Sequence, residues 1–235
     1  MQVHVILPAA GIGTRMSAGS HTAAPKQFLA LGGIPILIHS LRAFASVPSV
    51  KTILVAVRAN ERERVQLQID EFELAERVTV VEGGDSRQQS VANALRMLHA
   101  EEDDAVLVHD AVRPLIDAAS IERTIEAIGR TGAAIVGLPA VDTIKQVDRT
   151  ADGAIVATTI PRERIVQAQT PQGAKFSLMK RAFEEAERDD FSGTDEASLL
   201  ERAGIQVAVV AGSARNMKIT QPGDLELAEF YLAQR

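Results

Sequence analysis

The sequence contains no cysteine among its 235 residues. Disulfide bonds, thiolate metal sites and a cysteine nucleophile are therefore excluded, and the chemistry must come from other side chains. No apolar run approaches the roughly 20 residues that a membrane-spanning helix needs. The apolar start at 1–7 lacks a cationic region and meets Pro8 and Gly11 too soon for a signal peptide. We therefore expect a cytoplasmic protein with no membrane partner.

The chain also has fewer basic than acidic residues, with 25 Lys and Arg against 31 Asp and Glu, and its formal net charge is −6. This balance argues against nucleic acid or an anionic membrane as a partner, because both favour a basic face. Small anions remain compatible, since a local cluster of Arg and Lys dominates within a Debye length. A chain of this length can bury a sizeable core, and we expect residues 1–235 to form a single domain.

Short apolar runs, each followed by a helical pattern, recur along the chain. The runs are continuous rather than alternating, which indicates strands buried on both faces. This alternation predicts an α/β fold with a doubly wound, mostly parallel sheet and a site at the carboxyl ends of its strands. The expected strands are 3–7, 52–57, 78–81, 105–108, 133–138, 165–169, 207–210 and 217–220. The expected helices are 36–45, 61–76, 85–99, 120–130, 175–188, 194–203 and 225–232.

The stretch 141–163 interrupts this rhythm. It has two β-rich halves around Asp152-Gly153, a dipeptide that favours a tight turn. An inserted β-hairpin has no core of its own, and an isolated two-stranded ribbon is marginal in water. We therefore expect an arm that packs on a neighbour or reaches into a second subunit.

The exit of the first strand is the strongest candidate for a phosphate site. It reads Pro8-Ala9-Ala10-Gly11-Ile12-Gly13-Thr14-Arg15-Met16, and Lys26 follows. Small residues let the backbone approach a ligand, and successive N–H groups form an anion-binding concavity to which Arg15 and Lys26 add full charges. This combination suits a triphosphate. A dinucleotide fold fits less well because Met16 replaces the third Gly of G-x-G-x-x-G, and a tight turn with solvated cations is the structural alternative.

A second candidate, His109-Asp110-Ala111-Val112-Arg113-Pro114, follows the fourth expected strand. Asp110 can bind a hydroxyl of a sugar or polyol, or help to hold hydrated Mg²⁺, which takes one or two carboxylates beside substrate phosphates. Arg113 can pair with a substrate phosphate. The alternatives are a loop cap for Asp110 and a packed or surface position for His109, and for His109 we favour the structural role.

Three further features are weaker when taken alone. Gly83-Gly84-Asp85, with Ser90 in the following helix, can read a base edge or a ribose, although Gly-Gly before a helix is also an ordinary turn. Arg162 stands at the end of the arm. Lys218 lies in an expected strand, where it either snorkels at an edge or points into a site.

Together, these motifs resemble the 2-C-methyl-D-erythritol 4-phosphate cytidylyltransferase family almost from end to end. The same ordered set includes Pro25-Lys26-Gln27, Asp142-Thr143, Gln169-Thr170-Pro171-Gln172, Thr194-Asp195-Glu196-Ala197 and Asn216-Met217-Lys218. The resemblance implies a nucleotide-diphospho-sugar transferase-like sheet and a homodimer whose hairpin arms exchange. It also implies that CTP and methylerythritol 4-phosphate react with Mg²⁺ to release pyrophosphate, a step of non-mevalonate isoprenoid precursor biosynthesis.

The resemblance also implies a role for each candidate residue. Arg15 and Lys26 would stabilise the transition state, and Arg162 and Lys218 would position the acceptor phosphate. The implied nucleotide contacts are Pro8, Ala9, Ala10, Gly11, Gly13, Gly84, Asp85 and Ser90. The implied acceptor or nucleotide contacts are Asp110, Arg113, Thr143 and Thr170. The segment 17–24 is longer than the usual loop of the family, and no fused cyclase domain is expected after Arg235.

The residues support this chemistry without a general base. A phosphate monoester has a second pKa near 6, so at neutral pH it is already a dianionic nucleophile. The site must then supply in-line placement and positive charge, which Arg15, Lys26 and Mg²⁺ can provide. Two alternatives stay open. A ribitol 5-phosphate cytidylyltransferase shares nearly all of these motifs, and a catalytically silent nucleotide-binding protein could keep the fold.

Overall fold

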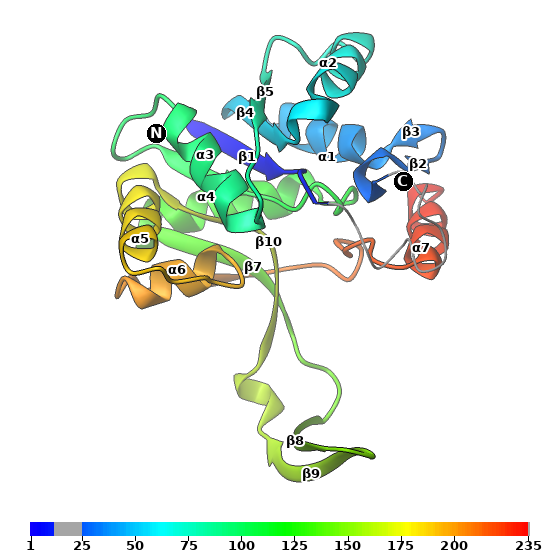
Figure 1. Ribbon diagram of the computed structural model, residues 1–235, viewed down its shortest axis with the longest axis vertical. Coiled ribbons are helices and arrows are strands. Elements are labelled where there is room, and N and C mark those ends of the chain that lie inside the picture. Colours follow the sequence, from blue (N-terminus) through cyan, green and yellow to red (C-terminus); the bar gives the residue numbers. More distant parts are fainter. Residues whose placement is uncertain (12–24, 235) are drawn as a thin grey trace.

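A central seven-stranded sheet organises the computed structural model, which describes residues 1–11 and 25–234. Figure 1 shows the sheet with helices on both faces and the arm projecting away from it. The strand order is β11-β7-β10-β6-β1-β4-β5. Neighbours are parallel except at β10, which is antiparallel to both β6 and β7. The strands are β1 (Val3–Pro8), β4 (Val50–Val57), β5 (Val78–Glu82), β6 (Ala105–Val108), β7 (Ala133–Pro139), β10 (Val166–Lys175) and β11 (Ala208–Ala211).

Alternate residues of the buried strands serve two cores. In β1, Val5 and Leu7 pack into one cluster while Ile6 packs into the other. The first cluster joins the sheet to α1 (Ile36–Ala45), α2 (Arg62–Glu71) and α4 (Ala118–Thr131). The second joins it to α3 (Arg87–Met97), α5 (Phe176–Arg188) and α6 (Glu196–Arg202). The expected doubly wound, mostly parallel fold is confirmed, because helices cover both faces and continuous apolar strands fill both cores.

Polar caps fix the helices that border the site. The Ser86 hydroxyl accepts the Gln89 N–H at 3.0 Å, so α3 begins at Arg87, two residues after the expected start at 85. Asp195 caps α6 by accepting the Ser198 N–H at 3.0 Å. These caps set where each helix starts, and hence which side chains of the first turn face the ends of the strands.

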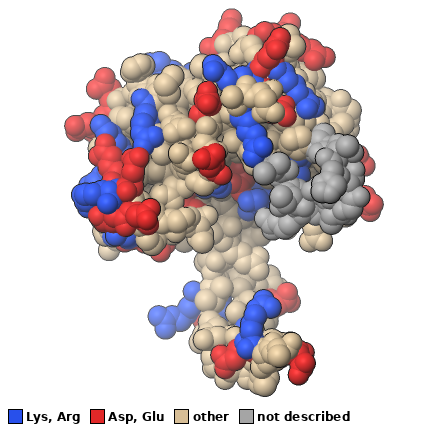
Figure 2. Space-filling view, in the orientation of Figure 1, with Lys and Arg blue, Asp and Glu red and all other residues tan. Residues whose placement is uncertain are grey.

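The interruption at 141–163 is a β-hairpin, as expected. Strands β8 (Ile144–Thr150) and β9 (Gly153–Ile160) pair with Thr150 opposite Gly153, and a short 3₁₀ turn, η3 (Arg162–Arg164), follows. The hairpin stands clear of the body, and its stalk shows mostly uncharged surface on the face drawn (Figures 1 and 2). Val141, Ile155 and Val156 are 79%, 66% and 56% exposed. The arm thus presents apolar side chains that its own chain leaves uncovered.

Besides shifts of up to three residues at element ends, the structure differs from the sequence-based elements at four places. Strand β10 runs to Lys175, six residues beyond the expected end at 169. The expected strand at 217–220 is wrong: this segment pairs with no strand in the part of the chain that the structure describes, and its Ile219 N–H donates to the Val112 carbonyl at 2.9 Å. It packs instead in a small third core with α7 (Pro222–Leu232), so its apolar character reflects burial and not a sheet position. The helix expected at 61–76 ends at Glu71. A short hairpin, β2 (Ala30–Leu31) and β3 (Ile34–Pro35), was not predicted.

Within the described residues, no helix combines the length and the apolar character needed to cross a bilayer.

Candidate active site

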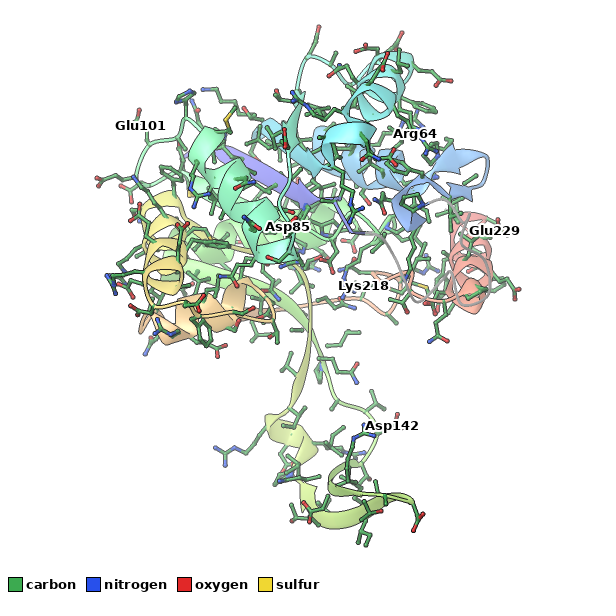
Figure 3. All side chains as sticks on the ribbon, in the orientation of Figure 1. Arg64, Asp85, Glu101, Asp142, Lys218 and Glu229 are labelled. Atoms are coloured by element: carbon green, nitrogen blue, oxygen red, sulfur yellow. The ribbon has the colours of Figure 1, made fainter. Side chains whose placement is uncertain are left out.

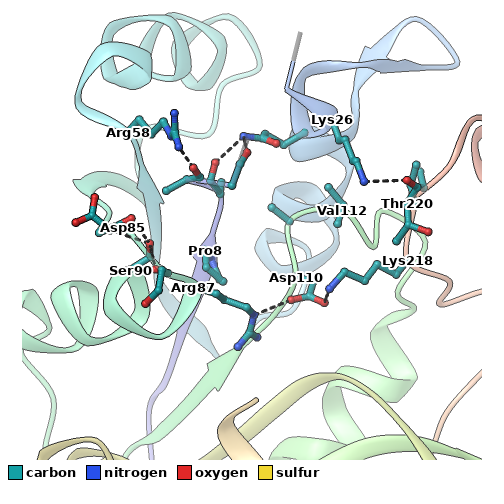
Figure 4. Close-up of a pocket in the computed structure, with 18 residues that line it drawn as sticks. Pro8, Lys26, Arg58, Asp85, Arg87, Ser90, Asp110, Val112, Lys218 and Thr220 are labelled. Atoms are coloured by element: carbon teal, nitrogen blue, oxygen red, sulfur yellow. Dashed lines mark hydrogen bonds and ion pairs between the residues drawn. The ribbon is translucent and has the colours of Figure 1, made fainter. Parts of the chain in front are cut away.

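A cavity of about 280 Å³ opens at the carboxyl ends of β1, β4, β5 and β6. This is the end of the sheet at which the fold is expected to bind ligands. Six separate segments of the chain line the cavity, and Figure 4 shows their side chains converging. The lining residues are Pro8, Ala9, Ala10, Gly11, Lys26, Gln27, Arg58, Gly84, Asp85, Ser86, Arg87, Ser90, Asp110, Ala111, Val112, Lys218, Ile219 and Thr220.

The exit of β1 is held by side chains from both sides. The Gln27 amide donates to the Ala9 carbonyl at 2.6 Å and to the Gly11 carbonyl at 3.3 Å. Arg58, the residue after β4, donates its Nε–H to the Ala10 carbonyl at 2.8 Å. Three successive carbonyls are therefore bonded before any ligand arrives, which fixes the backbone of the predicted phosphate loop where it enters the cavity.

The Gly83-Gly84 turn packs against this exit. A Cβ atom at Gly83 would lie 2.8 Å from Ala10 Cβ, so the close approach requires glycine. Ser90 is buried, and its Oγ accepts the Gly84 N–H at 3.0 Å and donates to the Ser86 carbonyl at 2.8 Å. Ser90 therefore shapes the turn that carries Gly84 and Asp85 into the cavity.

Two lysines border the opposite wall. Lys26 belongs to the 3₁₀ helix η1 (Lys26–Phe28), and its Nζ donates to the Thr220 carbonyl at 2.8 Å. Lys218 comes from the extended segment before α7, and its Nζ lies 2.9 Å from Asp110 Oδ2 (Figure 4). The sequence left open whether Lys218 snorkels at a sheet edge or points into a site. The structure places its ammonium in the cavity wall.

Asp110 lies at the centre of three cations. Its Oδ1 accepts from Arg87 Nε at 3.1 Å, while its Oδ2 faces Lys218 Nζ at 2.9 Å and Arg113 Nε at 3.5 Å. Burial by itself raises the pKa of Asp110, but the positive charges of Arg87 and Lys218 outweigh burial and hold the pKa well below its ordinary range. Asp110 is therefore a carboxylate at neutral pH that orients basic side chains around the cavity.

A hydrogen-bonded layer supports Asp110 from behind. The Asp110 N–H donates to Thr170 Oγ1 at 3.1 Å, and Thr170 Oγ1 lies 3.0 Å from Nδ1 of the fully buried His109. Nε2 of His109 faces the Arg113 carbonyl at 3.1 Å, so it carries the ring proton, and Nδ1 accepts from the Thr170 hydroxyl. Burial lowers the pKa of His109 to about 4, which keeps the ring neutral. His109 is buried and hydrogen-bonded within this layer, so its role is structural, as expected.

Arg113 and Thr170 act in this layer and do not line the cavity. Besides facing Asp110, Arg113 donates from Nη1 to the Asn216 carbonyl at 2.7 Å. The Asn216 amide in turn donates to the Thr170 carbonyl at 2.7 Å. These bonds tie the loop after β6 to β10 and to the segment that carries Lys218, and thus they set the spacing of the cavity walls.

Two of the remaining predicted residues lie on the arm. Thr143 and Arg162 are exposed on the arm, and Arg162 Nη1 donates to the Val141 carbonyl at 2.6 Å. Figure 3 shows how far the arm, marked by Asp142, stands from Asp85 and Lys218. The cavity of the same chain includes neither arm residue. Gly13 and Arg15 lie outside the described residues.

Sequence reasoning missed two arginines that the structure brings into the cavity. Arg58 follows the last residue of β4, so its place at a strand end was a usable signal. Arg87 pairs with Glu196, which is 109 positions away and enters the sequence motifs only as part of Thr194-Asp195-Glu196-Ala197. No local pattern marks that pair, because its partners meet only when α3 and α6 pack on the same face of the sheet.

Comparison with known proteins agrees with this geometry. The family model described as IspD, 2-C-methyl-D-erythritol 4-phosphate cytidylyltransferase, matches residues 3–234. A protein of that name from Acidobacterium capsulatum is 69% identical, with 100% of this chain and 99% of the relative covered. The fold superposes on 4-diphosphocytidyl-2C-methyl-D-erythritol synthase from Anaerococcus prevotii with a TM-score of 0.84 at 26% identity, covering 100% of this chain and 96% of the other. It superposes on the Francisella tularensis 2-C-methyl-D-erythritol 4-phosphate cytidylyltransferase with a TM-score of 0.81 at 35% identity, covering 98% and 99%.

A match of this length and identity, together with the agreement in fold, settles the family. The chain is a nucleotidyltransferase, and it belongs to the 2-C-methyl-D-erythritol 4-phosphate cytidylyltransferase family.

Proposed function

We propose that this chain joins CTP to 2-C-methyl-D-erythritol 4-phosphate and releases pyrophosphate, as a cytoplasmic enzyme of isoprenoid precursor synthesis without nucleic-acid or membrane partners. One observation carries the proposal. In a chain 69% identical to a relative of that name, the described part of the predicted phosphate loop, residues 8–11, borders a single cavity together with Lys26, Asp110 and Lys218. That arrangement suits a reaction between a nucleoside triphosphate and a phosphate monoester.

The reaction is an in-line displacement at phosphorus. An oxygen of the acceptor phosphate forms a bond to the α-phosphorus of CTP, while the bond from that phosphorus to the bridging oxygen breaks and pyrophosphate departs. The acceptor phosphate is a dianion at neutral pH, so no base has to remove a proton. The task left to the protein is to hold two anions together and to stabilise the charge that builds up between them.

Lys26 and Arg15 carry this stabilisation in our proposal. Lys26 is 7% exposed, and its ammonium already lies in the cavity wall, where the low local dielectric strengthens its attraction to phosphate. Lys218, oriented by Asp110 at 2.9 Å, meets the acceptor phosphate. We assign Arg15, which belongs to the predicted phosphate loop, to the same stabilisation of the transition state on the basis of the family motif alone.

The nucleotide occupies the side of the cavity formed by the β1 exit and the glycine turn. Pro8, Ala9, Ala10 and Gly11 offer backbone to the phosphates and sugar, and Gly13 continues that loop. Gly84 and Asp85 read the cytosine edge and the ribose, with Ser90 holding their turn in place through its bond to the Gly84 N–H. Gly83 packs against Ala10 on this side, and in our proposal the turn leaves little room for a purine.

Mg²⁺ is part of the proposal as an ion that arrives with the triphosphate. Among the described residues no group of three or more acidic or histidine side chains could hold a metal ion by itself. Asp110 keeps lone-pair capacity beyond its three basic neighbours, and a carboxylate in that state suits a water bound to Mg²⁺. Bound there, the ion would neutralise phosphate charge alongside Lys26 and Lys218.

We further propose that two chains form a homodimer and that each arm completes the partner's site. The arm is a two-stranded ribbon with no cover from its own chain, and it exposes Val141, Ile155 and Val156. An uncovered ribbon of this kind needs a neighbour. Thr143 and Arg162 on the arm would then reach the acceptor in the other chain, which accounts for their distance from the cavity of their own chain.

The test is a pyrophosphate-release assay with CTP and each of two acceptors. We expect kcat/KM for 2-C-methyl-D-erythritol 4-phosphate to exceed that for ribitol 5-phosphate by about 100-fold or more, since a site built around one set of hydroxyls leaves groups unpaired with another. A preference for ribitol 5-phosphate would refute the assignment of the acceptor. Binding of CTP without turnover of either acceptor would point to a silent nucleotide-binding protein and refute the assignment of the reaction.

A further inference from the structure

Arg87 occupies a position that the proposed reaction does not yet use. It opens α3, directly after the cap Ser86, and its side chain is 30% exposed along the cavity. All three guanidinium nitrogens are engaged. Nη1 and Nη2 donate to Glu196 at 2.7 and 2.9 Å, and Nε donates to Asp110 at 3.1 Å. Only a planar fork can make this pattern, because a lysine ammonium would present a single point of charge.

Glu196 is a rigid anchor for that fork. Its side chain is 1% exposed, so its charge depends on Arg87 for compensation. It stands in the first turn of α6, which Gln172 of β10 fixes by accepting the Ala197 N–H at 2.9 Å and donating to Asp195 at 2.9 Å. The bidentate pair therefore fixes the Arg87 guanidinium against the sheet, and the third nitrogen is left to act on Asp110.

The two carboxylate oxygens of Asp110 have different partners, which approach from opposite sides. Arg87 occupies Oδ1, while Lys218 and Arg113 lie against Oδ2. If the bond to Oδ1 were lost, the carboxylate could rotate toward Lys218 and Arg113, and the Lys218 ammonium would follow. The position of Lys218, which meets the acceptor phosphate in the proposed function, therefore depends on a residue at the nucleotide side of the cavity.

We propose that Arg87, anchored by Glu196, is a positioning residue that fixes the carboxylate of Asp110 and through it the acceptor-binding ammonium of Lys218. The inference rests on the proposed function and deepens it. Arg87 acts on the acceptor although it opens the helix that carries the nucleotide-side residue Ser90. If Arg87 merely held α3 in place, replacing it would instead disturb the Gly84 turn and hence the binding of CTP.

The first experiment measures KM for the acceptor and KM for CTP in the Arg87→Lys variant and compares how much each changes. We expect KM for the acceptor to rise by about 10-fold or more, the equivalent of one charge-assisted hydrogen bond. KM for CTP should change by less than about 2-fold, because the Gly84 turn is bonded by Ser90 and not by Arg87. A rise in KM for CTP alone, or equal rises for both substrates, would refute the positioning role.

A matched control exists on the same helix. Arg96 in α3 pairs with Glu187 of α5 through Nη2, at 2.6 and 2.7 Å from the two carboxylate oxygens, but the pair is exposed and touches neither the cavity nor Asp110. Arg96→Lys makes the same chemical change in a pair that also links α3 to another helix on the same face of the sheet. We expect both Michaelis constants to stay within about 2-fold of the wild type, since exposed pairs contribute little. An Arg96→Lys enzyme that matched Arg87→Lys would show a general effect of α3 and overturn the inference.

A double-mutant cycle tests whether Arg87 acts through Asp110. In an Asp110→Asn background the carboxylate is already gone, so adding Arg87→Lys should change KM for the acceptor by less than about 2-fold. The same factor in both backgrounds would mean that Arg87 acts independently and would refute the mechanism. Should Arg87→Lys not yield folded protein because Glu196 is left as a buried anion, Glu196→Gln replaces it in the cycle. Folded Glu196→Gln with unchanged KM for the acceptor would be equally decisive against the inference.

The wild-type chain is assayed first, because the inference depends on the proposed function. A wild type that is inert toward CTP with 2-C-methyl-D-erythritol 4-phosphate refutes both. An active wild type whose Arg87 variants respond as the Arg96 control does refutes the positioning role alone.

Discussion

His109 should make the chain less stable as the pH falls from neutral toward 4. The ring is fully buried, lies edge-on to Phe44 at a centroid distance of 4.9 Å, and has both nitrogens engaged, by Thr170 and by the Arg113 carbonyl. Burial lowers its pKa from the ordinary 6.5 to about 4. Protonation would require a charge in this site and would remove the acceptor that Nδ1 offers to the Thr170 hydroxyl.

The sign and size follow from proton linkage. A pKa that is lower in the folded state than in the unfolded state means that the unfolded chain binds more protons between pH 6.5 and 4, so stability falls with pH across that window. The full effect of a shift from 6.5 to about 4 is about 3 kcal/mol. Between pH 7.5 and pH 5 the expected loss from this one group is about 2 kcal/mol.

The assay is urea unfolding of the wild type and of His109→Gln at pH 7.5 and pH 5, at one protein concentration. The measured quantity is the change in the free energy of unfolding between the two pH values, so the constant cost of the substitution cancels within each protein. Burial lowers the pKa of His4 as well, but the contribution of His4 is common to both proteins and cancels when their changes are compared. The change should be smaller by about 2 kcal/mol in His109→Gln. His99→Gln, at an exposed site, controls for loss of an imidazole. Equal pH dependence in the wild type and in His109→Gln would refute the reasoning.

Three further predictions concern the reaction. Lys26→Ala should lower kcat by about 100-fold or more while CTP binding weakens much less, because a charge aimed at the transition state adds little to the ground state; unchanged kcat with a raised KM would contradict its role. CTP should be turned over far faster than GTP, and equal rates would contradict readout by Gly84 and Asp85. Gly83→Ala should raise KM for CTP, because its Cβ would lie 2.8 Å from Ala10 Cβ and 3.0 Å from Ser90 Oγ; an unaltered KM would show that this contact does not shape the nucleotide side.

The elements and the place of the site were predictable because they depend on local patterns. Continuous apolar runs predicted each strand of the sheet, and 105–108 was predicted to the residue. The β1 exit, Gly84, Asp85 and Asp110 line one cavity because the ends of β1, β5 and β6 meet at one edge of the sheet, whereas Lys26 and Lys218 reach the same cavity from outside the sheet. The wrong strand at 217–220 shows the limit of this reasoning, since an apolar run records burial but not the partner that buries it.

The electrostatics of the site could not be predicted, because they depend on pairs that only the tertiary fold creates. Asp110 is surrounded by Arg87, Arg113 and Lys218, of which only Arg113 is near it in sequence. The buried partner Glu196 has the same origin. Motif reasoning assigned Arg113 and Thr170 to substrate contacts, and this assignment stays a prediction. Their role in bracing the loop that carries Asp110 could not be predicted from the motifs.

The most direct test of the account is subunit mixing, because its central claim is a site that uses Lys26 of one chain and Arg162 of the other. Arg162→Ala and Lys26→Ala proteins, each nearly inactive alone, are mixed in equal amounts under conditions in which subunit exchange is confirmed, and pyrophosphate release is measured. A hybrid dimer with Arg162 acting in trans has one site with both defects and one with neither. About half of the dimers are then hybrids, and the mixture should recover about a quarter of wild-type activity. If both residues serve the site of their own chain, every site in the hybrid carries one defect, and no recovery after confirmed exchange would contradict the account.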